Sequence, residues 1–291
     1  MTRAQATAVG LIAVLLWSLL AVLTVGSAPV PPLLLNAITF SIGGSIGLVW
    51  VLASGGIRQL LSVGWRVYAF GTAGLFGYHF LYFSALRLAP AAEAGLICYL
   101  WPLLIVFLSG LMPGERLTGL HLAGALFSFA GTALLLLAPR AGPGLTNALP
   151  GFACAFLAAL TWAGYSVLSR RLGAVPTASV AVFCLLTAAL SGLVHLAVEP
   201  TLWPVGAQGW LACVGLGIGP VGVAFYVWDI GVKRGDIQLL GVAAYAAPLL
   251  STVALVCTGM AKGSARIGLA ALLITAGAGL AAWASARPRR G

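Results

Sequence analysis

Ten apolar segments of about 20 residues follow one another along this 291-residue chain, and they constrain its fold more than any other feature. They lie at about residues 6–26, 32–54, 66–87, 91–111, 118–138, 149–171, 177–198, 208–232, 237–260 and 265–285. Such a segment can cross a bilayer as a helix, which satisfies its own backbone hydrogen bonds in lipid. Charged residues make up only 7% of the chain, whereas a soluble domain carries about 25%. The sequence therefore predicts an all-α polytopic membrane protein with ten transmembrane helices.

A short pattern occurs twice. Gly95, Tyr99, Pro102, Leu103 and Leu104 recur 146 positions later as Gly241, Tyr245, Pro248, Leu249 and Leu250. The same offset pairs Arg87 with Lys233. The pattern indicates a duplication, with residues 1–140 and 141–291 as two five-helix repeats. Because five is odd, the second repeat enters the membrane inverted, an arrangement typical of secondary transporters with a site where the repeats meet. We expect a central cavity there.

The basic residues orient the chain. Eleven of the 15 Lys and Arg residues fall on the side of the N-terminus, namely Arg3, Arg58, Arg66, Arg116, Arg170, Arg171, Lys233, Arg234, Arg287, Arg289 and Arg290. This excess predicts that both termini are cytoplasmic. The net charge of +10 is scattered between apolar segments, so no basic stripe for nucleic acid exists. The expected partners are the lipid bilayer and a small molecule. The oligomeric state is left open, with a monomer plausible.

Cofactor and enzyme signatures are absent from the sequence. The five cysteines lack CxxC spacing, which argues against a metal site or a disulfide framework. No P-loop, HExxH, GxSxG or dinucleotide fingerprint appears. We therefore expect no cofactor, no metal, no catalytic residues and no ATP hydrolysis within the chain.

Three stretches resemble a known family. They are Trp17–Ser18, TWAGYSVLSRRL (Thr161 to Leu172) and PLLIVFLSGLMPGERLTGLHLAGALFSFAG (Pro102 to Gly131). A proline in the fourth span, followed by Gly-Glu-Arg and spaced glycines, is similar to the EamA-type branch of the drug/metabolite transporter superfamily. The resemblance implies ten helices in two inverted halves around a central cavity, exporting amino acids or related metabolites. The second half departs from the pattern, because Ala261 stands where the repeat would place the equivalent of Glu115.

Aromatic residues near the middle of the segments are candidates for the cavity wall. They are Trp17, Tyr78, His79, Tyr82, Tyr99, Trp101, Trp162 and Tyr245. An indole N–H has no partner among lipid tails, so a mid-span tryptophan tends to face protein or a wet cavity. We assign stacking to the tryptophans and hydrogen bonding to Tyr78, His79, Tyr82 and Tyr99. Packing between helices is the alternative. The other tryptophans, including Trp228, lie near segment ends and are expected at the membrane interface.

Two prolines are predicted to kink helices beside the cavity. Pro102 and Pro248 lie inside apolar segments, where a proline removes one backbone hydrogen bond. The carbonyls of Cys98 and Ala244 would then be free for water or a polar substrate. A kink required only for packing is the other interpretation. Of the acidic residues, Asp229 and Glu93 are expected to be solvated or paired with Lys233 and Arg87 respectively.

An aromatic wall with little fixed charge suits a zwitterion that carries an apolar ring. Our leading hypothesis is a secondary transporter that exports neutral, aromatic amino acids (Phe, Tyr, Trp) across the bacterial inner membrane by alternating access. Drugs, nucleosides or other metabolites on the same fold are the nearest alternative. A channel and an intramembrane enzyme are further alternatives. The enzyme would need clustered carboxylates or histidines, and this chain offers only isolated ones.

Overall fold

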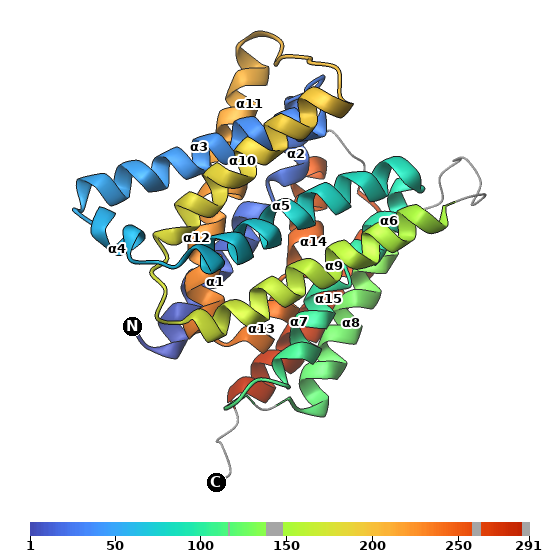
Figure 1. The fold of residues 1–291 in the computed structure, drawn as a ribbon. Coiled ribbons are helices and arrows are strands. Elements are labelled where there is room, and N and C mark those ends of the chain that lie inside the picture. The colour runs from blue at the N-terminus through green and yellow to red at the C-terminus, as the bar shows by residue number, and fades with distance from the viewer. Residues whose placement is uncertain (116, 138–147, 258–262, 287–291) are drawn as a thin grey trace.

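The computed structural model describes residues 1–115, 117–137, 148–257 and 263–286, which form helices and no strands. The first half contains α1 (Arg3–Trp17), α2 (Leu20–Gly26), α3 (Pro32–Ala53), α4 (Ile57–Leu61), α5 (Trp65–Leu88), α6 (Ala91–Cys98), α7 (Trp101–Ser109) and α8 (Gly119–Leu136). The second contains α9 (Leu149–Ser169), the 3₁₀ turn η1 (Arg170–Leu172), α10 (Ser179–Val198), α11 (Gly206–Ile218), the π-helix η2 (Gly219–Val223), α12 (Ala224–Arg234), α13 (Ile237–Ala243), α14 (Ala246–Cys257) and α15 (Ala265–Ala286). Figure 1 shows that α1 begins and α15 ends at the same end of the molecule, which we call the termini end.

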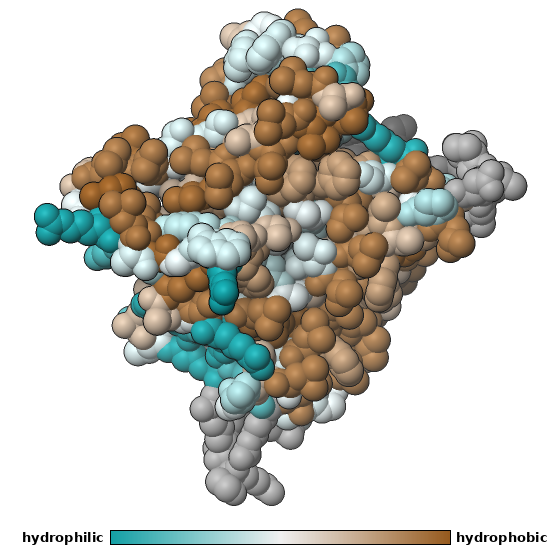
Figure 2. Space-filling view, viewed as in Figure 1, coloured by the Kyte–Doolittle hydropathy of each residue, from teal (hydrophilic) through white to brown (hydrophobic). Residues whose placement is uncertain are grey.

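The prediction of an all-helical membrane protein is confirmed at this level. Within the described chain, seven helical stretches have the length and hydropathy needed to cross a bilayer, and two further apolar helices, Glu93–Ser109 and Gly119–Leu135, are shorter. The 24-residue α5 lies in sequence between the span Pro32–Ala53 and the shorter helix Glu93–Ser109. Figure 2 shows hydrophobic residues over most of one face, with hydrophilic residues gathered in a few places. A surface of this kind is suited to lipid contact.

Three of the apolar stretches are broken near their middle. The breaks fall at Ser18–Leu19, between α1 and α2, at Tyr99–Leu100, between α6 and α7, and at Ala244–Tyr245, between α13 and α14. Pro102 and Pro248 follow the last two breaks closely, because proline has no N–H to continue the helix. The prediction of a free Ala244 carbonyl is wrong: this oxygen accepts a hydrogen bond from the Ala247 N–H at 3.1 Å, since the chain tightens into a turn before α14.

Helix packing follows the repeat. α8 packs along α15, and α3 packs along α10; in each pair the two helices lie 146 residues apart. Adding 146 to the residue numbers of α5 leads to α12, and subtracting 146 from those of α9 leads to α1. α5 packs extensively against α9, and α12 packs extensively against α1. At the α8–α15 contact, the Ser128 hydroxyl donates to the carbonyl of Ile274, its own equivalent, at 3.3 Å. The molecule is thus built around contacts between equivalent segments.

Two glycines allow α1 and α12 to approach closely. A methyl group added at Gly10 would lie 2.9 Å from the Cα of Gly231, and one added at Gly231 would lie 2.7 Å from the Cα of Gly10. Small residues at helix contacts are a common means of close packing within membranes.

Gly10→Ala is therefore expected to destabilise the protein by about 1–3 kcal/mol, the usual range for overpacking. Gly164→Ala on α9 is the control, because a methyl group there meets no atom within 4 Å and alanine favours a helix. Thermal unfolding in one detergent compares the two. Equal midpoints would contradict the close approach.

Candidate functional site

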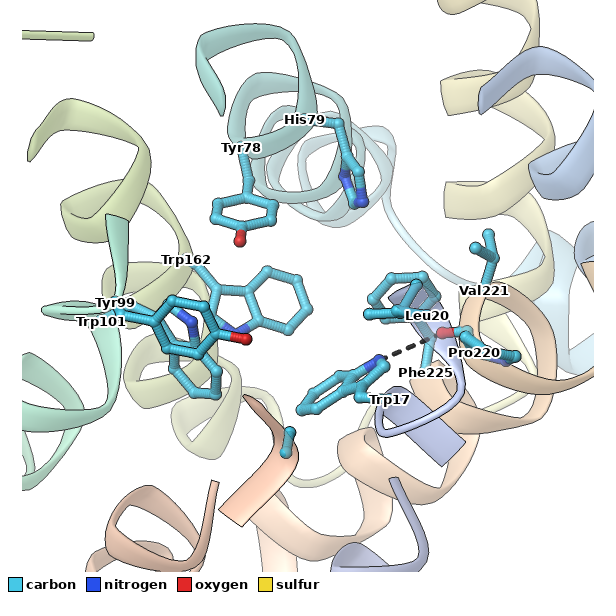
Figure 3. A pocket seen from close by; sticks show the side chains of 11 residues that line it. Trp17, Leu20, Tyr78, His79, Tyr99, Trp101, Trp162, Pro220, Val221 and Phe225 are labelled. Atoms are coloured by element: carbon cyan, nitrogen blue, oxygen red, sulfur yellow. Dashed lines mark hydrogen bonds between the residues drawn. The ribbon is translucent and has the colours of Figure 1, made fainter. Parts of the chain in front are cut away.

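A cavity of about 90 Å³ lies where the broken helices meet. It is lined by Trp17, Leu20, Tyr78, His79, Tyr99, Trp101, Trp162, Pro220, Val221, Phe225 and Ala247. Six of the eight predicted binding residues are thus brought together, as Figure 3 shows. Four places in the chain contribute to the wall: the break between α1 and α2, the break between α6 and α7, the π-helix η2 and the start of α14. Irregular backbone at membrane depth is tolerated where it is buried in protein or lines such a cavity.

Two of the polar groups in the wall are held by the backbone. The Trp17 indole donates to the carbonyl of Pro220 at 3.1 Å, which fixes the ring against η2. His79 Nδ1 lies 2.7 Å from the Leu75 carbonyl. Because a carbonyl only accepts, Nδ1 carries the proton, and in the neutral ring Nε2 is an acceptor. His79 therefore contributes a hydrogen-bond acceptor to the site.

Four further groups are donors with no hydrogen-bond partner among the described residues. Trp101 and Trp162 are only 6% and 3% exposed, yet neither indole N–H is bonded within the described chain. The hydroxyls of Tyr78 and Tyr99 are likewise unpaired there, and both are directed into the space between the rings in Figure 3. None of these four polar atoms is among the fully buried ones that lack a partner, so each reaches the open space of the cavity and can bind a ligand or water. None of the lining residues is acidic or basic apart from His79.

A cluster of tryptophans lies against the cavity. The ring centroid of Trp17 is 6.0 Å from Trp101, 6.1 Å from Trp162 and 5.0 Å from Trp228. The prediction that Trp228 lies at the membrane interface is wrong. It is 1% exposed, and its indole donates to the Ser166 hydroxyl at 3.1 Å, because α12 turns this face toward α1 and α9 rather than toward lipid.

Two predicted binding residues lie outside the cavity wall. Tyr82 stacks on Tyr78, with centroids 6.0 Å apart. Tyr245 is fully buried, and its hydroxyl accepts a hydrogen bond from the Leu103 N–H at 3.1 Å. In a regular helix this N–H would bond to the Tyr99 carbonyl, but the chain is broken there. Tyr245 therefore completes the first turn of α7, while its repeat equivalent, Tyr99, lines the cavity.

The two tyrosines are expected to respond differently to the loss of a hydroxyl. Tyr245→Phe leaves the Leu103 N–H without its acceptor and should cost about 1–3 kcal/mol of stability. Tyr99→Phe removes a hydroxyl that has no described partner and should leave stability within about 0.5 kcal/mol. Thermal unfolding of both variants measures the difference. A larger loss for Tyr99→Phe than for Tyr245→Phe would contradict this assignment.

Sequence reasoning missed several wall residues. Phe225 and Ala247 lie 146 positions after His79 and Trp101, so the repeat itself was a signal that could have identified them. The ring centroids of His79 and Phe225 are 6.2 Å apart. Pro220 and Val221 lie in the π-helix, which was not predicted from the sequence. A π-helix inserts one extra residue per turn and is frequent at functional sites.

An ionic network closes the termini end. Glu115, after α7, pairs with Arg170 of η1 and with Arg3 of α1, the latter at 3.1 Å. Arg3 also pairs with Asp236 at 3.2 Å. Arg170 donates to the carbonyls of Val232 and Gly235 at 2.8 and 3.0 Å. The termini-end network therefore joins segments from both halves, fourteen residues or about 21 Å along α1 from Trp17.

A second network lies at the opposite end. The side chain of Glu199 is 0% exposed and pairs with Arg87 and with His195, the latter at 3.0 Å. It also accepts the N–H groups of Leu33 and Leu34 at 3.0 and 3.2 Å, at the start of α3. The predicted pairing of Arg87 with Glu93 is therefore wrong, because α10 ends beside α3 and α5 and brings Glu199 within reach.

Asp229 and Lys233 pair at 2.9 Å, as predicted. With the two networks, this pair accounts for four of the five acidic residues in the chain. Ala261, the equivalent of Glu115, lies outside the described residues.

Known proteins resemble this chain over almost its whole length. The aromatic amino acid exporter YddG of Ancylobacter novellus is 55% identical over 282 residues, covering 97% of this chain and 98% of that protein. The proteins of the same name from Salmonella typhimurium and Escherichia coli are 28% and 27% identical, each covering 87% of this chain and 88% of the relative.

A solved structure and a family model agree with these matches. The structure, described as a crystal structure of protein, superimposes with a TM-score of 0.92 at 53% identity, over 98% of this chain and 100% of the other. The model of the EamA-like transporter family matches residues 5–137 and again residues 149–283. The chain belongs to the EamA-like transporter family.

Proposed function

We propose that this protein exports neutral aromatic amino acids from the cytoplasm to the periplasm by alternating access. It is a multi-pass protein of the inner membrane, and the relatives compared above are named as exporters of aromatic amino acids. The observation that carries the proposal is the cavity itself: its aromatic wall contains donors that have no partner among the described residues, and none of its lining residues is acidic. A zwitterion with an apolar ring matches such a wall, whereas a strongly charged solute would lack a counter-charge.

The wall offers a partner for each part of an amino acid. The indole N–H groups of Trp101 and Trp162 and the hydroxyl of Tyr99 can donate to a carboxylate. His79 Nε2 can accept from an ammonium group, which the faces of the tryptophans also attract. The ring of the substrate would stack among the aromatic side chains, where offset and edge-to-face contacts are favourable. Tyr82, Tyr245, Pro102 and Pro248 act from behind the wall, supporting the rings and the breaks.

In this proposal residues 1–140 and 141–291 are two inverted five-helix repeats, with ten spanning helices and both termini in the cytoplasm. The twofold family match and the contacts between equivalent helices support the division. The clustering of basic residues near the termini supports the orientation. The termini-end network then closes the cytoplasmic side, and the network around Glu199 lies on the periplasmic side. Rocking of the repeats about the cavity would open each side in turn.

Efflux of radiolabelled Phe, Tyr and Trp from proteoliposomes tests the proposed function. We expect saturable efflux of all three, accelerated by unlabelled substrate on the opposite side. Competition by nucleosides or drugs, with the three amino acids inert, would instead indicate another cargo. Flux that does not saturate would indicate a channel.

A further inference from the structure

The cavity is lined by two pairs of residues that occupy equivalent positions of the repeat. His79 and Phe225, which are 146 residues apart, both line it, and so do Trp101 and Ala247. The first pair is in contact, with ring centroids 6.2 Å apart. The cavity therefore lies between the repeats, and each wall position can be compared with its counterpart.

The two members of each pair differ in chemistry. His79 has an acceptor nitrogen where Phe225 has a phenyl ring, and Trp101 has an indole where Ala247 has a methyl group. The first repeat thus supplies most of the hydrogen-bonding groups, while Val221, Phe225 and Ala247 of the second supply an apolar wall. A bound amino acid would direct its charged groups toward the first repeat and the Trp162 indole, and its side chain toward these three apolar residues.

Among these apolar residues, Ala247 has the smallest side chain. It is 4% exposed and lies in the first turn of α14, where its backbone N–H is bonded to the Ala244 carbonyl at 3.1 Å. An alanine methyl group has no alternative rotamer, so it cannot turn away from a bound side chain. Phe225 is already stacked on Phe40, with centroids 5.4 Å apart, and is held by that contact.

We propose that Ala247 is a specificity-determining residue that sets the size of the aromatic ring the protein accepts. The inference rests on the proposed function. A methyl group in place of a second indole leaves space in the wall of a cavity of about 90 Å³, and a larger side chain at this position would take part of that space. In apolar pockets one methylene changes discrimination by roughly 10–200-fold. A larger residue at this position should reduce the export of tryptophan, which carries an indole, more than the export of phenylalanine, which carries a phenyl ring.

A size series tests the proposal. Export of labelled Trp and Phe is measured in proteoliposomes containing the wild type, Ala247→Val or Ala247→Leu. We expect the Trp-to-Phe ratio of kcat/KM to fall about 10-fold or more, and further for Leu than for Val. Ala247→Gly should shift the ratio in the opposite direction and improve export of 5-methyltryptophan relative to tryptophan.

Ala246→Val is the matched control, because Ala246 is the adjacent residue of α14 and does not line the cavity. The Trp-to-Phe ratio of kcat/KM for Ala246→Val should equal that of the wild type. The proposal is overturned if Val, Leu and Gly at position 247 all leave the ratio unchanged, or if the control shifts it equally. If the larger variants fail to fold, Ala247→Gly alone decides. A wild type that exports neither amino acid would instead refute the proposed function.

Discussion

Glu199→Ala is expected to lower the free energy of unfolding by about 1–3 kcal/mol, the cost of leaving buried hydrogen-bond donors without their acceptor, because the ion-pair partner Arg87 is itself 45% exposed. The Glu199 side chain is completely buried and accepts from Arg87, His195 and two backbone N–H groups of α3. Alanine would leave all of these donors without their acceptor at once. Since the residue ties α10 to α3 and α5, the loss should affect the whole fold. Thermal unfolding in detergent measures it.

Glu93→Ala is the matched control for this experiment. Glu93 is an acidic residue in the first turn of α6 and has no ion pair with any described residue. Its replacement should change stability by no more than about 0.5 kcal/mol. Glu199→Gln keeps the shape and some hydrogen bonding, so it should fall between the two. A Glu199→Ala variant as stable as Glu93→Ala would show that the buried cluster contributes nothing to the fold.

The second large effect is expected at the other end. Glu115→Ala removes the carboxylate between Arg3 and Arg170, whose side chains are 34% and 17% exposed. The two guanidinium groups would then repel each other, with Asp236 the remaining acidic side chain of the network among the described residues and Arg170 still bonded to the carbonyls of Val232 and Gly235. We expect the termini end to open at least about 10-fold more often, equivalent to about 1.4 kcal/mol. Hydrogen–deuterium exchange of peptides from α13 should accelerate by that factor.

The opposite end provides the internal control for this measurement. Peptides from the start of α3 should exchange as in the wild type, because their N–H groups remain bonded to Glu199. In the proposed alternating-access cycle export should also fall, since the state in which the termini end is closed would be lost. Equal acceleration at both ends would mean that Glu115 supports the fold as a whole and does not control one side.

Much of the fold could be predicted because lipid imposes a simple rule on sequence. Apolar length alone located the helical segments, and proline chemistry located the breaks before Pro102 and Pro248. The break at Ser18–Leu19 contains no proline and so leaves no such signal. The π-helix at Gly219–Val223 contains Pro220, but a proline inside a helix predicts an interruption and not the π form.

The candidate site was predictable only where a residue's depth in the membrane decides its role. Trp17, Trp101 and Trp162 lie in mid-span, where an indole needs protein or water as a partner. Trp228 looked interfacial because it lies near a segment end, yet its burial depends on which face α12 turns toward α1. Tyr245 illustrates the same limit: the repeat places it correctly along the helix but does not reveal that its hydroxyl bonds to the backbone of α7.

The unlike pairs in the cavity wall affect how many ways a cargo can bind. Two identical walls related by a twofold axis would hold one molecule equally well in either of two reversed poses, with its charged groups toward one repeat or the other. With His79 opposite Phe225 and Trp101 opposite Ala247, the reversed pose would bring a carboxylate against phenyl and methyl groups. In the proposed arrangement of two repeats, the divergence of a few side chains would therefore leave a single favoured orientation for the cargo.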